Sequence, residues 1–497
     1  NGLIPFAMGE ISVGVREQLL DIVGAKAFSD EPDVLRKFSR DFSVVPPGMP
    51  SYVVKPKDAE AVRKIVELAN ETNAPVVPSS SKVHFHGATI PKQGGIVVDL
   101  SGMNRVYEID GENRRVRIGA GVTWGKLTSK LHEKGLRAIM PLLPHADRSV
   151  VTDFLEREVP TNTVYDYGEP LQGMEVVWPN GEIFRTGSAS VPGYPDSPSK
   201  GGNPSGPGID FYRFLQGAQG TMGIVTWANL KFERLPKMDK ILFAPAEDLA
   251  YAIEFLYRIL RLRIGQECLL LNDVDLAAIV AKDGRKDFEK VRASLPPWTL
   301  ILVLSGLERR PEEKIEYEEK ALRETIKNEF REISLVENLP GTPAFGRRLL
   351  EMLRSPWPKK GPYWRNRRKG ACQSLLFITK PVLAPGLIEK VAGVAAEHGF
   401  PRSDVGGYLQ PIEHNRACQL AFDFFYDSSD DDEIERTRSL YREAGRALLD
   451  EGALFTRPYG ELAPMVYERA AGYATTLKRV KDIFDGNHIM NPGQLCF

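Results

Sequence analysis

Short apolar segments alternate with amphipathic helical segments along the first half of the chain. Residues 59–70 carry apolar side chains at helical spacing, and Asp58 is placed to cap the helix that they predict. The runs 74–78 and 95–100 have the length and composition of buried strands. Even the longest apolar run, 299–307, is far short of the ~20 residues that span a bilayer. The pattern therefore predicts a fold of mixed helices and strands without a membrane span.

Two hairpins and a second helix are predicted in the same half. Residues 106–118 alternate in polarity and are broken by a turn sequence at 110–113. In 175–185, Asn180 and Gly181 separate two apolar runs, which is a strong hairpin signal because both turn residues tolerate positive φ. The apolar spacing of 124–134 predicts a helix.

The composition and the hydrophobic pattern of the sequence change after Pro236. Residues 192–207 are rich in Pro, Gly and Ser and predict an excursion without regular structure. Beyond it, long charged helical stretches surround a β-run at 298–304, so we place a domain boundary near 237. Apolar residues at helical spacing return between Tyr473 and Phe484.

Charge and cysteine content exclude several classes of function. The chain has 65 Lys and Arg against 66 Asp and Glu, a net charge of -1, which argues against nucleic acid or an acidic membrane as a partner. The four cysteines are scattered, without a CxxC pair, and the seven histidines lack zinc-site spacing, so no metal site is predicted. This cysteine usage fits a reducing compartment and predicts a cytoplasmic protein. The chain begins at Asn1 without Met, so a trimmed leader stays open.

The common nucleotide and nucleophile motifs do not apply. Residues 119–124 begin like a dinucleotide fingerprint, but Trp124 stands where a small residue is required. Residues 121–126 have the wrong glycine spacing for a P-loop. Residues 79–82 match SxxK, yet Pro78 and Gly87 predict a loop rather than the start of a helix.

Three groups of segments carry a resemblance to a known family. The first group comprises Leu155-Glu156-Arg157, Tyr167-Gly168-Glu169, 173–177, 180–182 and 185–187. The second is 217–226, GAQGTMGIVT, a motif that is also typical of D-lactate and glycolate dehydrogenases. The third is Asn491-Pro492-Gly493. In these segments the chain resembles flavoproteins of the vanillyl-alcohol oxidase and p-cresol methylhydroxylase family. The resemblance implies an enzyme with FAD as cofactor.

The resemblance also implies a domain organisation. It predicts a two-part FAD-binding domain of the p-cresol methylhydroxylase type and an α+β cap domain that covers the flavin and binds substrate. In this sequence the first part of the FAD-binding domain corresponds to 1–236 and the cap to 237–450. The segment 451–497 is expected to return to the FAD-binding domain.

Two stretches are implied to hold FAD. The loop 79–88 falls where the family binds the pyrophosphate, although Ser80 and Ser81 replace glycines, and a hydroxyl-rich loop without a ligand is the alternative. The stretch 145–153 runs beside the flavin ring in the family and is bulkier and more polar here. The implied cofactor-binding residues are Ser79, Ser80, Ser81, Lys82, Val83, His84, Gly87, Ala88, Ser149, Thr152, Asp153, Val159 and Ile224.

Four residues are implied to act on the substrate. Arg457 aligns with the family's active-site arginine, with Tyr459 two residues on. His86 stands where phenol-oxidising members carry a tyrosine, and His414 is a candidate base. A surface position for Arg457 and a supporting hydrogen bond for His86 are the alternatives. Neither His84 nor His86 falls where relatives bond the flavin covalently.

A basic and aromatic cluster at 357–369 includes Arg365 and Arg368. We expect it to form a solvated face. A clamp for an acidic substrate or a docking patch for an electron-transfer partner are the alternatives.

The sequence thus predicts an FAD-dependent oxidase or dehydrogenase that removes a hydride from a benzylic alcohol, an alkylphenol or a related alcohol. One alternative is a 2-hydroxy acid dehydrogenase, and another is a partner subunit without turnover, with or without flavin. The expected partners are a small-molecule substrate and an electron acceptor, namely oxygen, a cytochrome or an iron–sulfur protein. A homodimer is the default assembly, and an electron-transfer partner subunit is the other expectation.

Overall fold

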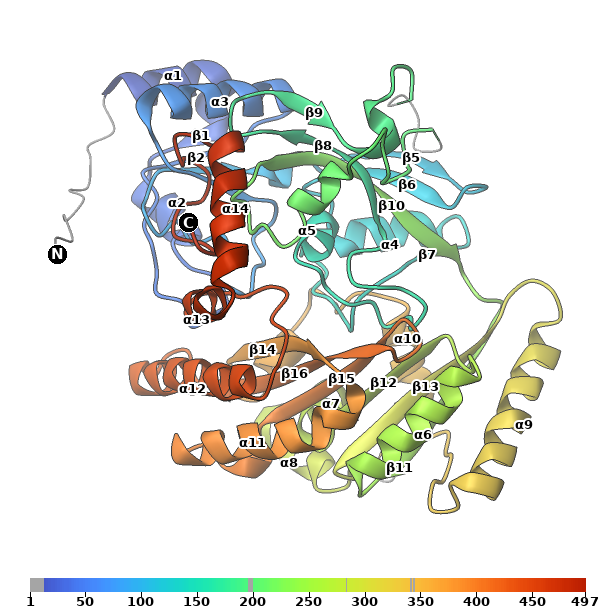
Figure 1. Ribbon diagram of the computed structural model, residues 1–497. Helices are drawn as coiled ribbons and strands as arrows, with labels where there is room; N and C mark the ends of the chain where they lie inside the picture. The colour runs from blue at the N-terminus through green and yellow to red at the C-terminus, as the bar shows by residue number, and fades with distance from the viewer. Residues whose placement is uncertain (1–12, 195–199, 283, 340–341, 343–344) are drawn as a thin grey trace.

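Three β-sheets organise the chain, and helices cover them (Figure 1). The computed structural model describes residues 13–194, 200–282, 284–339, 342 and 345–497. The predicted excursion at 192–207 lies partly outside these residues. The other described residues of that stretch form turns and bends between two short 3₁₀ helices.

The first sheet is small and has the order β1-β2-β4-β3, with parallel pairing of β4 to both β2 and β3. Its strands are β1 (Phe28–Ser29), β2 (Tyr52–Val54), β3 (Val76–Ser79) and β4 (Ile96–Asp99). Helix α3 (Ala59–Thr72) packs against it beside α1 (Val13–Val23). The Asp58 carboxylate accepts a hydrogen bond of 2.9 Å from the Ala61 N–H, which confirms the predicted helix start.

The second sheet is antiparallel and has the order β5-β6-β10-β8-β9, with β7 paired to β10. Both predicted hairpins are confirmed, as β5/β6 and β8/β9. Its strands are β5 (Val106–Asp110), β6 (Arg115–Gly119), β7 (Leu136–Ala138), β8 (Leu171–Val177), β9 (Ile183–Arg185) and β10 (Ile224–Arg234). The helices α4 (Trp124–His132) and α5 (Val150–Leu155) bury apolar side chains against it.

The third sheet is antiparallel, with the order β11-β13-β12-β15-β16-β14. Its strands are β11 (Met238–Ala246), β12 (Glu267–Asn272), β13 (Trp298–Gly306), β14 (Ala371–Thr379), β15 (Gly406–Ile412) and β16 (Ala417–Tyr426). The boundary near 237 lies between β10 and β11, and we keep the three-part division as our proposal.

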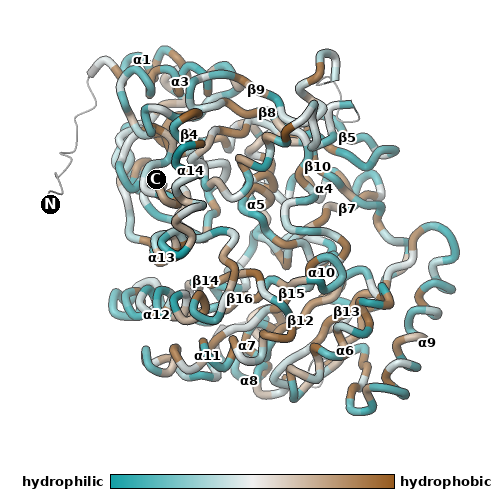
Figure 2. Tube along the Cα trace, viewed as in Figure 1, coloured by the Kyte–Doolittle hydropathy of each residue, from teal (hydrophilic) through white to brown (hydrophobic). Residues whose placement is uncertain are grey.

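Both faces of the third sheet are covered, because alternate residues of each strand enter different cores. Leu242 of β11 packs with α6 (Leu249–Arg261), α9 (Pro311–Glu329), α11 (Ala384–Glu397) and α12 (Asp431–Asp450). Phe243 packs with α7 (Asp273–Val280), α8 (Gly284–Arg292) and α10 (Phe345–Leu353). Figure 2 shows hydrophobic residues along β12 and hydrophilic residues on α12.

The C-terminal segment returns to the first two sheets. Helices α13 (Leu462–Arg469) and α14 (Ala471–Phe484) lie in the upper part of Figure 1, with the first two sheets. Phe484 packs against the core of the second sheet. The chain then pairs with β3, since the Val76 N–H donates to Ile489 at 2.7 Å and the Asn491 N–H donates to Val76 at 2.9 Å. No helix in the described part of the chain is long and apolar enough to cross a membrane.

A buried ion pair fixes α14. The Lys481 ammonium donates to the carbonyls of Thr221 and Met490, at 2.5 and 3.1 Å, and to the Asp485 carboxylate. Both side chains of the pair are buried.

We predict that Lys481→Met lowers the free energy of unfolding by about 3–5 kcal/mol, because it leaves the Asp485 carboxylate buried without its cation. Denaturant unfolding followed by circular dichroism measures the change. Lys478→Met, at an exposed position of the same helix, is the matched control. Equal stability of the two variants would contradict the prediction.

Candidate functional site

Two small cavities lie on either side of α5 and the loop 79–88. The interdomain cavity, about 50 Å³, takes its walls from the loop 79–88, the segment 141–159, the segment 363–366 and strands of the third sheet. The inner cavity, about 80 Å³, lies within the N-terminal half. The interdomain cavity is lined by Phe85, His86, Pro141, Leu142, Pro144, His145, Arg148, Asp153, Glu158, Val159, Tyr363, Arg365, Asn366, Cys372, Ser374, Leu376, Tyr408 and Gln419. The inner cavity is lined by Pro78, Ser80, His84, Ala88, Thr89, Leu100, Ala120, Val151, Thr152, Leu155, Glu156, Leu215, Ala218, Gln219, Gly220, Gly223, Ile224 and Val225.

The loop 79–88 is held by its own hydroxyl groups. The Ser79 hydroxyl donates to the Ser81 carbonyl at 3.1 Å and lies 3.2 Å from His84 Nε2. The Ser81 hydroxyl donates to the Val83 carbonyl at 3.2 Å. Four of the five residues from Ser79 to Val83 are buried. Lys82 is the exception, because it is exposed and lines neither cavity.

The end of the loop is anchored to distant segments. Gly87 adopts φ +76°, and a Cβ there would lie 2.5 Å from Val45. Its N–H donates to Asp41 at 2.7 Å and its carbonyl accepts from Gln494. The Ala88 carbonyl accepts from Asn491 at 2.7 Å. The C-terminal segment thus fixes the loop above the inner cavity.

His84 and His86 point to different cavities. His84 lines the inner cavity, and its Nδ1 has no hydrogen-bond partner among the described residues. His86 lines the interdomain cavity. Burial lowers the pKa of His84 to about 3 and the pKa of His86 to about 4. Both imidazoles are therefore neutral at pH 7.

Ser149 caps the N-terminus of helix α5, because its hydroxyl accepts a hydrogen bond from the Thr152 N–H at 3.2 Å. The same hydroxyl donates to the Ala120 carbonyl at 2.7 Å. The helix places Thr152 in the inner cavity and Asp153 in the interdomain cavity. The Trp124 indole donates to Asp153 at 2.6 Å.

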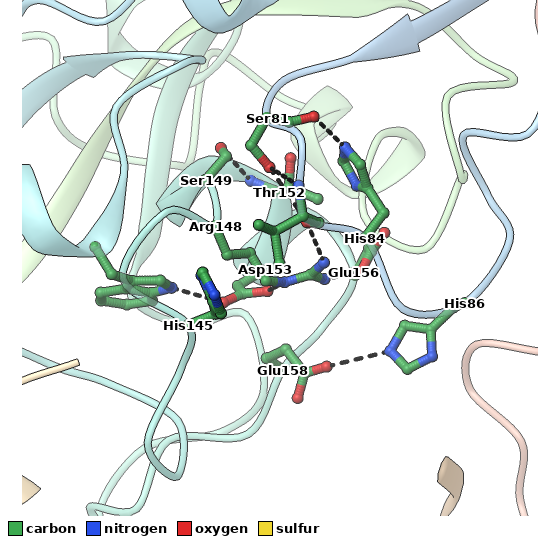
Figure 3. A network of polar contacts seen from close by, with 12 residues as sticks. Ser81, His84, His86, His145, Arg148, Ser149, Thr152, Asp153, Glu156 and Glu158 are labelled. Carbon is green, nitrogen blue, oxygen red and sulfur yellow. Dashed lines mark hydrogen bonds and ion pairs between the residues drawn. The ribbon is translucent and has the colours of Figure 1, made fainter. Parts of the chain in front are cut away.

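A buried guanidinium occupies the centre of the site (Figure 3). Arg148 donates to the carboxylates of Asp153 and Glu156 and, at 3.0 Å, to the Val83 carbonyl. It also lies over the Phe85 ring, 5.1 Å from the centroid. Burial disfavours its charge, but the carboxylates around it outweigh burial and raise the pKa of Arg148.

Two carboxylates near Arg148 have different charge states. Burial raises the pKa of Glu156 to about 7, although Arg148 opposes the shift. Burial alone would also raise the pKa of Glu158, but Arg457 and His86 outweigh it and hold that pKa below its usual range. Glu158 is thus ionised, 2.8 Å from Arg457 Nη1 and 3.7 Å from His86 Nε2.

Arg457, Tyr459 and His86 form one cluster at the C-terminal side of the site. The Tyr459 and His86 rings are stacked, with centroids 4.4 Å apart. Arg457 donates to Gln419 at 2.6 Å and to the Glu156 carbonyl at 2.9 Å. The Tyr459 hydroxyl is buried and has no partner among the described residues. Tyr459 and Arg457 line neither cavity, and they reach the interdomain cavity only through their contacts with His86 and Glu158.

The remaining predicted residues divide between the cavities and elsewhere. Val159 lines the interdomain cavity and Ile224 the inner one. His414 lies on the turn between β15 and β16, where its N–H donates to Thr163 at 2.7 Å, and it lines neither cavity. Tyr408, on β15, lines the interdomain cavity instead.

The prediction of a solvated face at 357–369 is wrong. Arg365 pairs with the buried Asp423 at 2.9 Å and lines the interdomain cavity. Arg368 is buried and pairs with Asp404 at 2.7 Å. Their partners lie in distant segments, so local composition could not distinguish a buried pair from a solvated charge.

Sequence reasoning assigned no role to Arg148, Glu156 or Glu158, although Arg148 and Glu156 lie in segments that it singled out. The available signal was the replacement of small residues by charged ones at 145–153. Charges in a segment predicted to be buried must be paired.

We predict that His86→Phe changes the pH dependence of stability. His86 has a folded-state pKa of about 4 against 6.5 in its ordinary state, so its contribution to stability is lost as pH falls from 6.5 to 4. In this pH window the variant should take up fewer protons on unfolding than wild type, by up to one. The slope of its unfolding free energy against pH is therefore smaller. Glu156 acts in the opposite direction above pH 4.5, so the informative quantity is the difference between wild type and variant.

Denaturant titrations between pH 4 and 7 measure that difference. The exposed His488, replaced by Phe, controls for the loss of a histidine. Parallel curves for wild type and His86→Phe would contradict the prediction.

Comparison with known proteins places the N-terminal half in a defined domain family. Residues 50–187 match the model of the FAD binding domain. The glycolate oxidase subunit GlcD of Bacillus subtilis is 24% identical, and the match covers 98% of this chain and 97% of that protein. The 4-cresol dehydrogenase [hydroxylating] flavoprotein subunit of Pseudomonas putida is 33% identical over 150 residues, 29% of this chain and 28% of that protein.

The fold matches a solved structure over nearly the whole chain. The crystal structure of p-cresol methylhydroxylase with substrate bound has a TM-score of 0.84 at 19% identity, and the match covers 98% of both chains. The two-part FAD-binding domain with an α+β cap is thereby confirmed as the fold of this chain.

The chemistry of the inner cavity suits FAD. Ser80 and Thr152 offer hydroxyls, and Leu100 and Ile224 belong to an apolar wall. His84 Nδ1 and Gln219 Oε1 are buried without partners among the described residues. Such groups fit the phosphates, the hydroxyls and the adenine ring of a dinucleotide.

The matched domain, the fold and the donor groups agree with one another. The chain carries an FAD binding domain at 50–187, and it is an FAD-dependent oxidoreductase with the fold of p-cresol methylhydroxylase.

Proposed function

We propose that this enzyme oxidises a small, uncharged aromatic alcohol or alkylphenol at the interdomain cavity, whose side chains must move apart to admit it. The observation that carries the proposal is that both arginines that line this cavity are already paired with carboxylates. Arg148 pairs with Asp153 and Arg365 with Asp423. The cavity residue Glu158 is likewise paired, with Arg457 behind the wall. A substrate carboxylate would have to separate one of these pairs, whereas a neutral substrate would not.

The walls of the cavity support an aromatic substrate. Phe85 and Tyr363 are stacked with centroids 5.4 Å apart, and Tyr408 and Leu376 lie on the third sheet. Aromatic rings pack well on such surfaces. The cavity also has Pro144 and His145 where relatives carry an acid near the flavin.

The residues of this chain would bind the substrate oxygen and handle its proton. The chemistry that FAD supplies when bound is acceptance of a hydride. His86 is neutral at pH 7 and can accept the proton of a substrate hydroxyl, after which the nearby Glu158 would stabilise the imidazolium. The Tyr459 hydroxyl can donate to the same oxygen, and Arg457 adds positive charge behind it.

Oxidation of a 2-hydroxy acid is the second candidate. The near full-length similarity to a glycolate oxidase subunit favours it. A partner subunit without turnover is the third, favoured by the crowded segment 145–153. In either enzyme, electrons would leave for oxygen, a cytochrome or an iron–sulfur protein.

We predict that a benzylic alcohol or an alkylphenol bleaches the flavin absorbance of the FAD-loaded protein under anaerobic conditions and that D-lactate does not. Stopped-flow absorbance measures the reduction. Bleaching by D-lactate alone would replace the proposal by the second candidate. Loaded protein that neither class bleaches would favour the third.

We further predict that Tyr459→Phe slows flavin reduction by about 10²-fold, because it removes one donor to the reacting oxygen while the ring can still stack on His86. The FAD content should stay unchanged. Tyr473→Phe, at an exposed position of α14, is the matched control. Wild-type reduction rates in the Tyr459→Phe variant would remove this hydroxyl from the mechanism.

A further inference from the structure

The two cavities are too small for FAD as the side chains stand. Their volumes, about 50 and 80 Å³, leave room for only a few water molecules. Sites for drug-sized ligands have about 300–1,000 Å³, and FAD is larger than most such ligands. The matched domain contributes residues to both cavities, so a bound dinucleotide would have to extend through the wall between them.

That wall consists of side chains that join the loop 79–88 to the segment 145–158. The Ser80 hydroxyl is hydrogen-bonded to the Thr152 hydroxyl. Arg148 reaches across to the Val83 carbonyl at 3.0 Å and covers the Phe85 ring. The two stretches are therefore bonded directly to each other at these points, which separate the inner cavity from the interdomain cavity.

The ion pairs of Arg148 hold the wall in place. Its carboxylate partners lie on the two sides of the wall, Asp153 in the interdomain cavity and Glu156 in the inner cavity. Side-chain exposure of the three residues is 3%, 2% and 9% for Arg148, Asp153 and Glu156. Separation of the pairs would leave charges buried, so the closed arrangement resists opening.

We infer that Arg148 and its two carboxylates form a closed gate across the FAD site, and that FAD binds only after the Arg148 side chain has left the wall. The gate lowers the apparent affinity for FAD, because only the open fraction of the protein can bind it. The substrate plays no part in this inference, which concerns the cofactor alone.

The test compares FAD uptake by wild type and by the triple variant Arg148→Gly/Asp153→Asn/Glu156→Gln. The triple variant removes the gate without leaving an unpaired buried charge. Quenching of flavin fluorescence, on protein freed of flavin, gives the association rate and the Kd. The variant should bind FAD about 10²-fold more tightly, the factor expected when a buried ion pair no longer has to open.

Two further variants keep the test independent of folding. Ser80→Gly/Thr152→Gly opens the neighbouring hydroxyl bridge without any change of charge. Its FAD association rate should rise, whereas its final affinity also reflects the loss of two hydroxyls that face FAD, so only the rate is compared for this variant. Arg331→Gly, at an exposed position, should behave as wild type. Circular dichroism of each variant verifies that it is folded.

Equal association rates for wild type and both opened variants, with an unchanged affinity of the triple variant, would overturn the gate. Weaker binding by the triple variant would also overturn it, since Arg148 would then be a ligand of FAD. If no folded form binds FAD, the gate is likewise refuted. The proposed substrate class fails separately, when a loaded protein is not bleached by aromatic alcohols.

Discussion

The burial of one guanidinium determines how the site is built. Arg148 is almost completely inaccessible to solvent, so its charge has to be matched by carboxylates and its donors by acceptors. Asp153, in α5, and Glu156, directly after it, meet this requirement with their carboxylates. The Glu156 carbonyl in turn accepts from Arg457, which also donates to Gln419 of β16, so a second guanidinium links the end of α5 to the third sheet.

The local signals in the sequence were sufficient for much of the N-terminal half. The Asp58 cap and the Asn180–Gly181 turn act over a few residues, and the helix and hairpin that they predict are present. The order of strands within each sheet had no such signal. It depends on pairings such as β6 with β10, whose residues lie more than a hundred positions apart.

The site was predictable from the sequence only in part. The resemblance identified the two stretches that meet. Seven of the residues that it implied to bind the cofactor line the cavities, namely Ser80, His84, Ala88, Thr152, Asp153, Val159 and Ile224. His86, from the implied catalytic set, lines the interdomain cavity. It could not reveal that Glu158 pairs with Arg457, 299 residues away. Nor could it show that the Lys82 side chain is exposed, because the sequence of a loop does not determine whether a charged side chain points into a cavity or into solvent.

The attachment of the C-terminal residues to β3 has a consequence for biosynthesis. Asn491 bonds to the Ala88 carbonyl across 403 positions, and the edge of the first sheet is completed only when residues near 490 arrive. During translation, the loop 79–88 must therefore wait for almost the entire chain before it acquires its final contacts. Long-range closure of this kind is slow, which makes the nascent N-terminal half a natural client for chaperones.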